Sequence, residues 1–68
     1  MLIAKHEYGT EVELTCKAGV LGKVQKNRLL VRPDGEVEAW DKDCEYWWPA
    51  TLSHETIRRA HNWADYGK

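Results

Sequence analysis

Phenylalanine is absent from this 68-residue chain, and cysteine, proline and methionine are scarce. The two cysteines, Cys16 and Cys44, could form at most one disulfide bond. No hydrophobic stretch resembles a secretory signal or approaches the ~20 apolar residues of a membrane span. We therefore expect a cytoplasmic protein with no membrane partner, in which both cysteines are reduced and buried as small apolar residues.

Recognisable signatures of catalysis and of metal binding are also missing. The cysteines and histidines form none of the close pairs that are typical of structural zinc sites. The glycines at positions 19 and 22 have the wrong spacing for a phosphate-binding loop, and no nucleophile stands beside a matching base. The sequence therefore predicts a protein that is not an enzyme and that holds no cofactor and no metal ion.

Large aromatic side chains are what the sequence offers in place of a large core. A chain of this length is one domain, residues 1–68, and buries only about 60 % of the surface that its unfolded form exposes. The four tryptophans and three tyrosines can compensate, since each removes about 150–250 Å² from water when buried. All of them carry a polar group, which suits the edge of a core or a surface that meets a partner.

Charge is nearly balanced in total but is unevenly distributed along the chain. The formal net charge is −1, which argues against a strongly basic nucleic-acid binder. Residues 17–32 contain five basic and no acidic side chains, whereas residues 34–45 contain six acidic side chains and only Lys42 as a base. Two interpretations stay open, namely ion pairing across a hairpin and two faces of opposite charge.

The pattern of apolar residues predicts an antiparallel sheet over residues 1–48. Residues 11–16 alternate strictly, which is typical of a half-buried strand with Val12, Leu14 and Cys16 on its inner face. Further strands are expected over residues 2–8, 20–25, 29–32 and 37–40. A tight turn at Asn27-Arg28 is expected to separate the third strand from the fourth.

The turn Pro33-Asp34-Gly35 fixes the register of the hairpin that follows. Proline presets its own φ, aspartate bonds to nearby backbone and glycine accepts positive φ, so a three-residue loop pairs Arg32 with Glu36. This register places apolar side chains on a core face, namely Leu29, Val31, Val37 and Ala39. The opposite face receives Arg28, Leu30, Arg32, Glu36, Glu38 and Trp40, and it sets Arg28 beside Trp40 as a cation–π pair.

The period of the sequence becomes helical after Pro49. Ser53 is a suitable N-cap, and Glu55 is favoured by the positive end of the helix dipole. A helix over residues 53–66 would place Ile57, Ala60, His61 and Ala64 on one face, with Gly67 as its stop. The predicted fold class is therefore α+β, a small antiparallel sheet of four to five strands with one C-terminal helix.

The order of these elements resembles a small SH3-like β-barrel over about residues 8–48. The resemblance depends on the pattern Gly9-Thr10-x-Val12, the Gly19-x-x-Gly22-x-Val24 arch, the short hairpin of residues 29–40 and the exit Trp48-Pro49. It implies a barrel-like fold of a kind that includes binding modules for peptides and for nucleic acids.

Protein binding is the function that these observations favour. Tryptophan, tyrosine and arginine dominate binding hot spots, and the expected contact residues are Trp40, Trp47, Trp48, Arg28 and Arg32. Trp47 and Trp48 are adjacent in a strand, so they point to opposite faces, and one of them is either exposed or covered by the helix. The hypothesis is a non-catalytic interaction module, an accessory or inhibitory protein of a phage or mobile element that binds a host protein.

The alternative hypothesis is a small nucleic-acid-binding barrel that uses the basic hairpin of residues 23–32. Its contact residues would be Lys23, Lys26, Arg28, Arg32 and Trp40, with the indole ring as a stacking platform. The acidic segment that follows would repel phosphate, so the protein-binding hypothesis is preferred. A homo-oligomer is compatible with either hypothesis.

Overall fold

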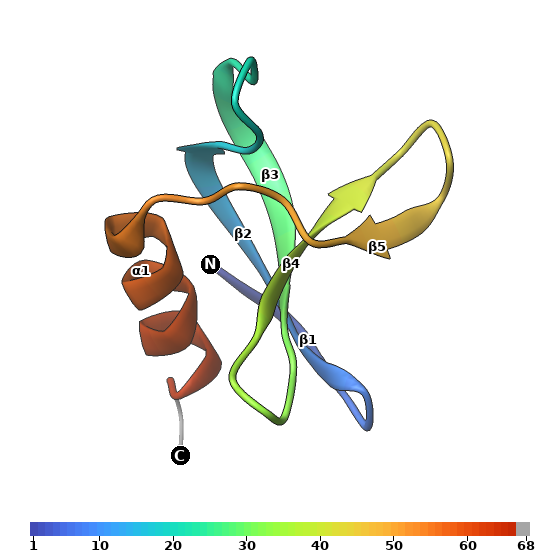
Figure 1. Ribbon diagram of the computed structural model, residues 1–68. Coiled ribbons are helices and arrows are strands. Elements are labelled where there is room, and N and C mark those ends of the chain that lie inside the picture. Colours follow the sequence, from blue (N-terminus) through green and yellow to red (C-terminus); the bar gives the residue numbers. More distant parts are fainter. Residues whose placement is uncertain (67–68) are drawn as a thin grey trace.

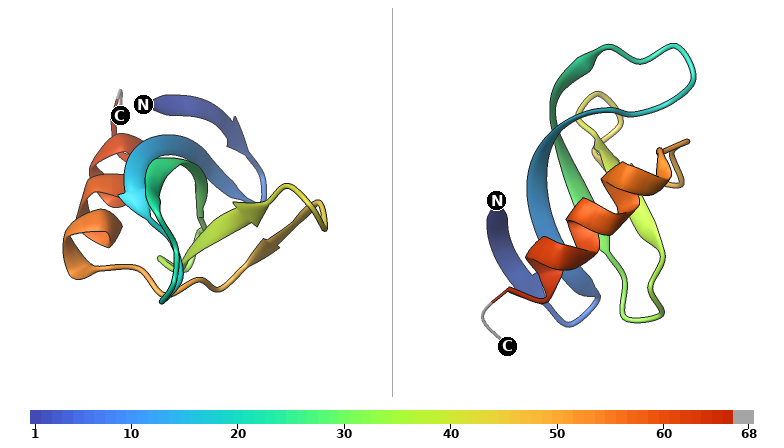
Figure 2. Two further views of the ribbon diagram at one scale, coloured as in Figure 1. Left: turned by 90° about the horizontal axis from the view of Figure 1, so that it is seen from above. Right: turned by 90° about the vertical axis from the view of Figure 1, so that its left-hand side faces the viewer.

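The computed structural model describes residues 1–66, which form five antiparallel strands in one sheet and one C-terminal helix (Figure 1). The order of strands in the sheet is the order in the chain, β1-β2-β3-β4-β5. The elements are β1 (Leu2–His6), β2 (Gly9–Lys17), β3 (Val24–Val31), β4 (Val37–Asp41), β5 (Tyr46–Trp48) and α1 (His54–Ala64). The predicted α+β class is confirmed, and the curled sheet is compatible with a small barrel-like fold (Figure 2).

The core lies between one face of the sheet and helix α1. The alternation predicted within β2 is confirmed, because Val12, Leu14 and Cys16 are all buried. The register predicted from the Pro33 turn is also confirmed, since Leu29 pairs with Ala39 and Val31 with Val37. The helix lies across β2 and β3 (Figure 2) and contributes the small buried side chains Ala60 and Ala64.

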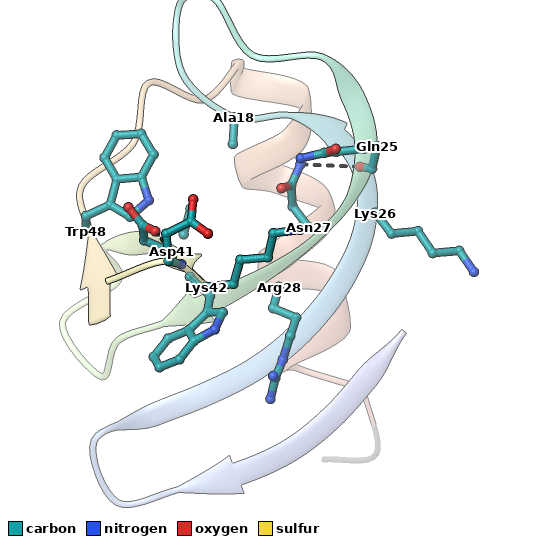
Figure 3. A pocket seen from close by; sticks show the side chains of 11 residues that line it. Ala18, Gln25, Lys26, Asn27, Arg28, Asp41, Lys42 and Trp48 are labelled. Atoms are coloured by element: carbon teal, nitrogen blue, oxygen red, sulfur yellow. Dashed lines mark hydrogen bonds between the residues drawn. The ribbon is translucent and has the colours of Figure 1, made fainter. Parts of the chain in front are cut away.

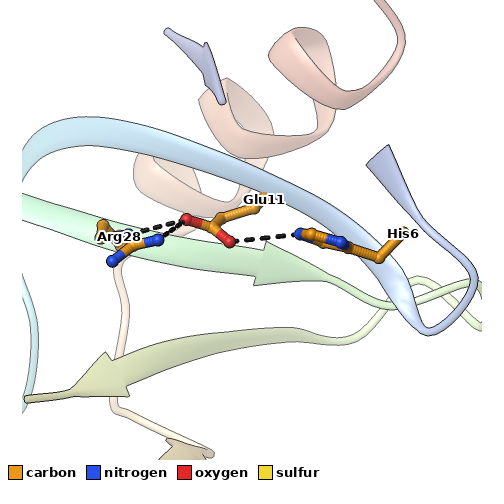
Figure 4. A network of polar contacts seen from close by, with 3 residues as sticks. All are labelled: His6, Glu11 and Arg28. Carbon is orange, nitrogen blue, oxygen red and sulfur yellow. Dashed lines mark hydrogen bonds and ion pairs between the residues drawn. The ribbon is translucent and has the colours of Figure 1, made fainter. Parts of the chain in front are cut away.

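On the opposite face of the sheet, two ion pairs lie over a buried leucine. Leu30 is fully buried between its cross-strand neighbours Glu11 and Glu38. The Glu11 carboxylate accepts hydrogen bonds from the guanidinium of Arg28, with Nε at 2.7 Å, and lies 3.3 Å from Nε2 of His6 (Figure 4). Arg32 Nε donates to Glu38 Oε1 at 2.6 Å. The two diagonal ion pairs therefore flank Leu30 and cover it with polar groups that are themselves satisfied.

Two predictions for the centre of the chain are wrong, one of a strand and one of a turn. Residues 20–23 form a turn and a loop rather than a strand, and β3 begins only at Val24. No turn interrupts β3 at Asn27-Arg28, because Asn27 pairs with Leu14 and its Nδ2 donates to the carbonyl oxygen of Cys16 at 2.8 Å. A residue that favours turns is thus held in a strand by a side-chain hydrogen bond to the neighbouring strand.

Helix α1 begins where its cap residue predicts. The Ser53 hydroxyl accepts a hydrogen bond from the Thr56 backbone N–H at 3.1 Å, as an N-cap does. The helix ends at Ala64, two residues before the predicted end, and the predicted stop Gly67 lies outside the described residues. Within residues 1–66, no helix combines the length and the apolar character that crossing a membrane requires.

Candidate binding groove

Strands β3 and β4 pair over only three residues and then separate. Their ladder consists of Val31 with Val37, Leu30 with Glu38 and Leu29 with Ala39. Beyond this point residues 24–28 of β3 remain paired with β2, whereas Trp40 and Asp41 of β4 pair with β5. The sheet is therefore split between the β2–β3 pair and the β4–β5 pair, as the diverging ribbons in Figure 1 show.

The split opens into a groove of about 490 Å³, which we call the β3–β4 groove. Trp48 and Asp41 lie on one side of it, and Asn27 and Arg28 lie on the other (Figure 3). Its lining combines indole rings, three basic side chains and two acidic ones: Trp40, Trp48, Lys26, Arg28, Lys42, Asp41 and Asp43. The groove thus offers apolar surface beside charges of both signs.

The backbone N–H and C=O groups of every second residue in β3 point toward this groove. The Arg32 N–H donates to the Glu36 carbonyl at 2.7 Å, which makes this the hydrogen-bonded pair that closes the hairpin. In an antiparallel ladder the backbone groups of every second residue point to the same neighbour, so Leu30, Arg28 and Lys26 also face the β4 side. Leu30 pairs with Glu38 there, but among residues 1–66 neither Arg28 nor Lys26 has a β4 partner. Trp40 presents its own backbone groups to the split for the same reason.

The charged side chains around the groove are partly committed to other contacts. The Arg28 side chain is 49 % exposed. Its guanidinium is nevertheless bound to Glu11 of β2, the strand that lies on the other side of β3 from the groove. The Asp41 carboxylate accepts the backbone N–H groups of Asp43 at 2.9 Å and Cys44 at 3.2 Å, which shapes the turn between β4 and β5. The predicted cation–π pair of Arg28 with Trp40 is wrong as a cross-strand pair, because the β3–β4 ladder stops at Leu29.

The structure brings together three of the five predicted protein-contact residues. Trp40, Trp48 and Arg28 all line the groove. Trp47 lies on the other face of β5 from Trp48 and packs edge-on against Trp40, with ring centroids 5.0 Å apart. Both Trp47 and Trp48 are half-buried, and Trp48 packs against the core. Arg32 lies apart from the groove, beside Glu38 and the Tyr8 carbonyl oxygen.

The residues proposed for nucleic-acid contact are also separated. Lys26, Arg28 and Trp40 line the groove, whereas Lys23 lies in the loop before β3 and Arg32 at the opposite end of that strand. Lys42, Asp41 and Asp43 also line the groove, although the sequence did not indicate them as site residues. Their position immediately after a predicted strand that contains Trp40 is the one signal that could have indicated them.

The cysteines and histidines do not form a site. Cys16 is buried, as expected, but Cys44 is exposed, so the prediction that both are buried is wrong for Cys44. The two thiols are free and are not joined in a disulfide bond. Across residues 1–66, no group of three or more histidine, cysteine, aspartate or glutamate side chains is placed to hold a metal ion.

Comparison with protein families, with curated proteins and with solved structures finds no match to this chain. The geometry of the groove is therefore the basis on which a function is proposed.

Proposed function

We propose that the chain is a small, non-catalytic protein-interaction module of SH3-like barrel type that binds an extended segment of another protein in the β3–β4 groove. The observation that carries the proposal is the separation of β3 from β4 after three residue pairs, beside two tryptophans. In this role the protein acts on its partner as an accessory or inhibitory factor.

Backbone pairing is the first source of affinity in this proposal. An extended peptide can add to an exposed strand edge, where main-chain hydrogen bonds supply affinity and side-chain pockets supply specificity. Lys26 and Arg28 offer such an edge on β3, and Trp40 offers one on β4. An inserted segment would satisfy backbone groups that the split leaves to water.

The indole rings are the second source of affinity. Trp40 and Trp48 line the groove and are both half-buried, so a ligand side chain can contact them while the protein stays folded. Tryptophan is among the residues most enriched in binding hot spots. Because Lys26, Lys42, Asp41 and Asp43 supply both signs of charge, the groove favours a segment that is not strongly charged overall.

The test uses peptides selected from a displayed random-sequence library on the immobilised protein. A selected peptide is titrated into the protein while tryptophan fluorescence is recorded, and amide hydrogen exchange is then measured with and without the peptide. We expect the amides of Lys26, Arg28 and Trp40 to become protected in the complex. Methylating every second backbone nitrogen of the peptide should weaken binding in either phase of the alternation, because one set of N–H groups pairs with β3 and the other set with β4.

A matched control is available at Tyr8, which is 47 % exposed and lies outside the residues that line the groove. Tyr8→Ser should bind the selected peptides as the unmodified protein does, whereas Lys26→Pro should weaken binding by removing a backbone donor at the edge. Selected peptides that leave all three groove amides unprotected, or that bind as well after methylation in either phase as before it, would contradict the proposal.

Single-stranded nucleic acid is the second candidate ligand, because Lys26 and Arg28 lie in the same groove as the Trp40 ring. Two observations argue against nucleic-acid binding. Arg28 is paired with Glu11 and Arg32 with Glu38, and the groove also contains acidic side chains, Asp41 and Asp43. Titration with single-stranded DNA and RNA decides between the two candidates. Saturable binding whose affinity falls steeply between about 50 and 200 mM salt would favour nucleic acid.

A further inference from the structure

The loop between β2 and β3 carries the most exposed large apolar side chains of residues 1–66. Leu21 is 96 % exposed, Val20 72 % and Val24, at the start of β3, 71 %. The loop projects at one end of the molecule, well away from the turn between β3 and β4 (Figures 1 and 2). Burial of exposed leucine and valine side chains that lie next to one another lowers the free energy when a partner removes them from water.

The backbone of this loop holds the apolar side chains outward. Gly19 has a φ of +86° and its N–H donates to the Thr51 carbonyl at 3.0 Å, which ties the loop to the segment that precedes α1. A Cβ on Gly22 would lie 2.0 Å from the Ala18 carbonyl oxygen, so the turn between them closes only with glycine at this position. The exposure of Val20 and Leu21 is thus imposed by a defined turn.

Lysines flank the apolar residues on both sides. Lys17 ends β2 and Lys23 precedes β3, and both are exposed. No acidic residue occurs in the sequence between Glu13 and Asp34. We use the name hairpin tip for Lys17, Val20, Leu21, Lys23 and Val24. The hairpin tip combines aliphatic groups at its apex with positive charge at its base.

We propose that the hairpin tip docks on the surface of an anionic phospholipid bilayer. Val20 and Leu21 would enter the boundary between headgroups and acyl chains, while Lys17 and Lys23 would contact lipid phosphates, as in other peripheral contacts that combine apolar burial with electrostatic attraction. This site lies outside the β3–β4 groove and does not depend on the proposed function. The expectation of no membrane partner rested on the lack of a spanning segment, which a surface contact does not need.

The shape and chemistry of the hairpin tip favour a lipid surface over a macromolecule with a fixed shape. The tip projects from the rest of the molecule (Figures 1 and 2), its apolar side chains are aliphatic, and it lacks the tryptophan, tyrosine and arginine that concentrate in protein-binding hot spots. It also lacks arginine and aromatic side chains for base contacts or stacking on nucleic acid. A fluid surface of negative charge accepts aliphatic side chains without a matching pocket.

The test is co-sedimentation of the full chain with vesicles of two compositions. One is made of phosphatidylcholine alone, and the other contains added phosphatidylglycerol as the anionic lipid. We expect binding to the anionic vesicles only, weakening as salt rises because the charges are exposed. Leu21→Gln should weaken this binding about tenfold or more, since the substitution removes one fully exposed leucine from the contact. Lys23→Gln should weaken it about fivefold.

Matched substitutions away from the hairpin tip complete the experiment. Lys5→Gln removes the same charge from an exposed position in β1, and Tyr66→Ser removes an exposed ring after α1, so both should bind vesicles as the unmodified chain does. An unchanged melting temperature for Leu21→Gln will show that its effect is on binding, because the side chain is 96 % exposed.

Three outcomes would overturn the proposal. The first is equal binding to both vesicle compositions, and the second is binding to anionic vesicles that Leu21→Gln does not change. The third is the absence of binding to either kind of vesicle. A titration with a DNA duplex is added for that case, and the proposal fails whatever its result. In that third case, DNA binding that Leu21→Gln abolishes would assign the hairpin tip to nucleic acid instead.

Discussion

The two halves of β3 differ in almost every physical respect although they form one continuous strand. Residues 29–31 pair with strands on both sides and are buried, with Leu29 and Leu30 fully inaccessible to solvent. Residues 24–28 pair with β2 alone, and all of them except Asn27 are exposed. One half therefore contributes to the core, while the other half provides one wall of a groove.

This contrast shows how so small a sheet can form a core and still keep a strand edge open. Within residues 1–66 the sheet has one short segment in which β2, β3 and β4 are all paired. It holds the core residues Val12, Leu29, Val31 and Ala39, whereas Leu14 and Cys16 lie opposite the open half of β3. Where β4 departs from β3, the sequence supplies tryptophans and charged residues in place of aliphatic ones. Residues 29–31 of β3 thus contribute to stability, whereas residues 24–28 of the same strand are left for binding.

The largest expected effect comes from breaking the buried half. Leu29→Ala should destabilise the protein by about 2–5 kcal/mol, because it removes a fully buried side chain and leaves a cavity. Val24→Ala, in the other half, should change the free energy of unfolding by about 0.5 kcal/mol or less. Urea denaturation of both variants measures the contrast. Similar losses of stability in the two variants would show that the halves are not distinct.

A smaller effect is expected from the ion pair that ties the open half to β2. Glu11→Gln removes the charge from a carboxylate whose side chain is only 6 % exposed, and it leaves Arg28 able to hydrate. We expect a loss of about 1–2 kcal/mol in the free energy of unfolding. Glu38→Gln, whose side chain is 21 % exposed, is the control and should cost less. Equal costs would mean that the burial of Glu11 has no energetic consequence.

The smallest of the three effects on stability is expected from Asn27→Ala, a substitution next to the boundary between the two halves of β3. Asn27→Ala should cost about 0.5–1.5 kcal/mol, because the Cys16 carbonyl loses a side-chain donor at 2.8 Å. Asn27→Gly should cost about 0.5–1 kcal/mol more than alanine, since glycine is less favourable than alanine within a strand. Thermal denaturation of both variants is the measurement. A glycine variant that is more stable than the alanine variant would indicate a turn at this position.

Local patterns in the sequence were enough to predict much of the fold. The strict alternation around Val12 and Leu14, the turn at Pro33-Asp34-Gly35 and the cap at Ser53 each act within a few residues, and the structure agrees with all of them. Short-range rules apply well in such cases because turn chemistry and side-chain period determine the local backbone directly.

The features that the sequence did not predict depend on contacts between distant segments. The exposed half of β3 has no apolar alternation, and Asn27 resembles a turn residue until its bond to Cys16 is known. Leu21 looks like a core residue but is held outward by the turn at Gly22. The β3–β4 groove arises because a ladder stops after three pairs, and the change to aromatic and charged residues at that point does not by itself show that the two strands separate.

Amide hydrogen exchange along β3, in the protein without ligand, shows directly whether the strand edge at the groove is open. The Leu30 amide, which faces β4 and pairs with Glu38, should exchange slowly and with a free energy near that of global unfolding. The amides of Arg28 and Lys26 face the same side without a partner, so they should exchange at least about a hundredfold faster. Protection of Arg28 and Lys26 equal to that of Leu30 would show that β3 and β4 stay paired, and it would contradict the existence of the groove.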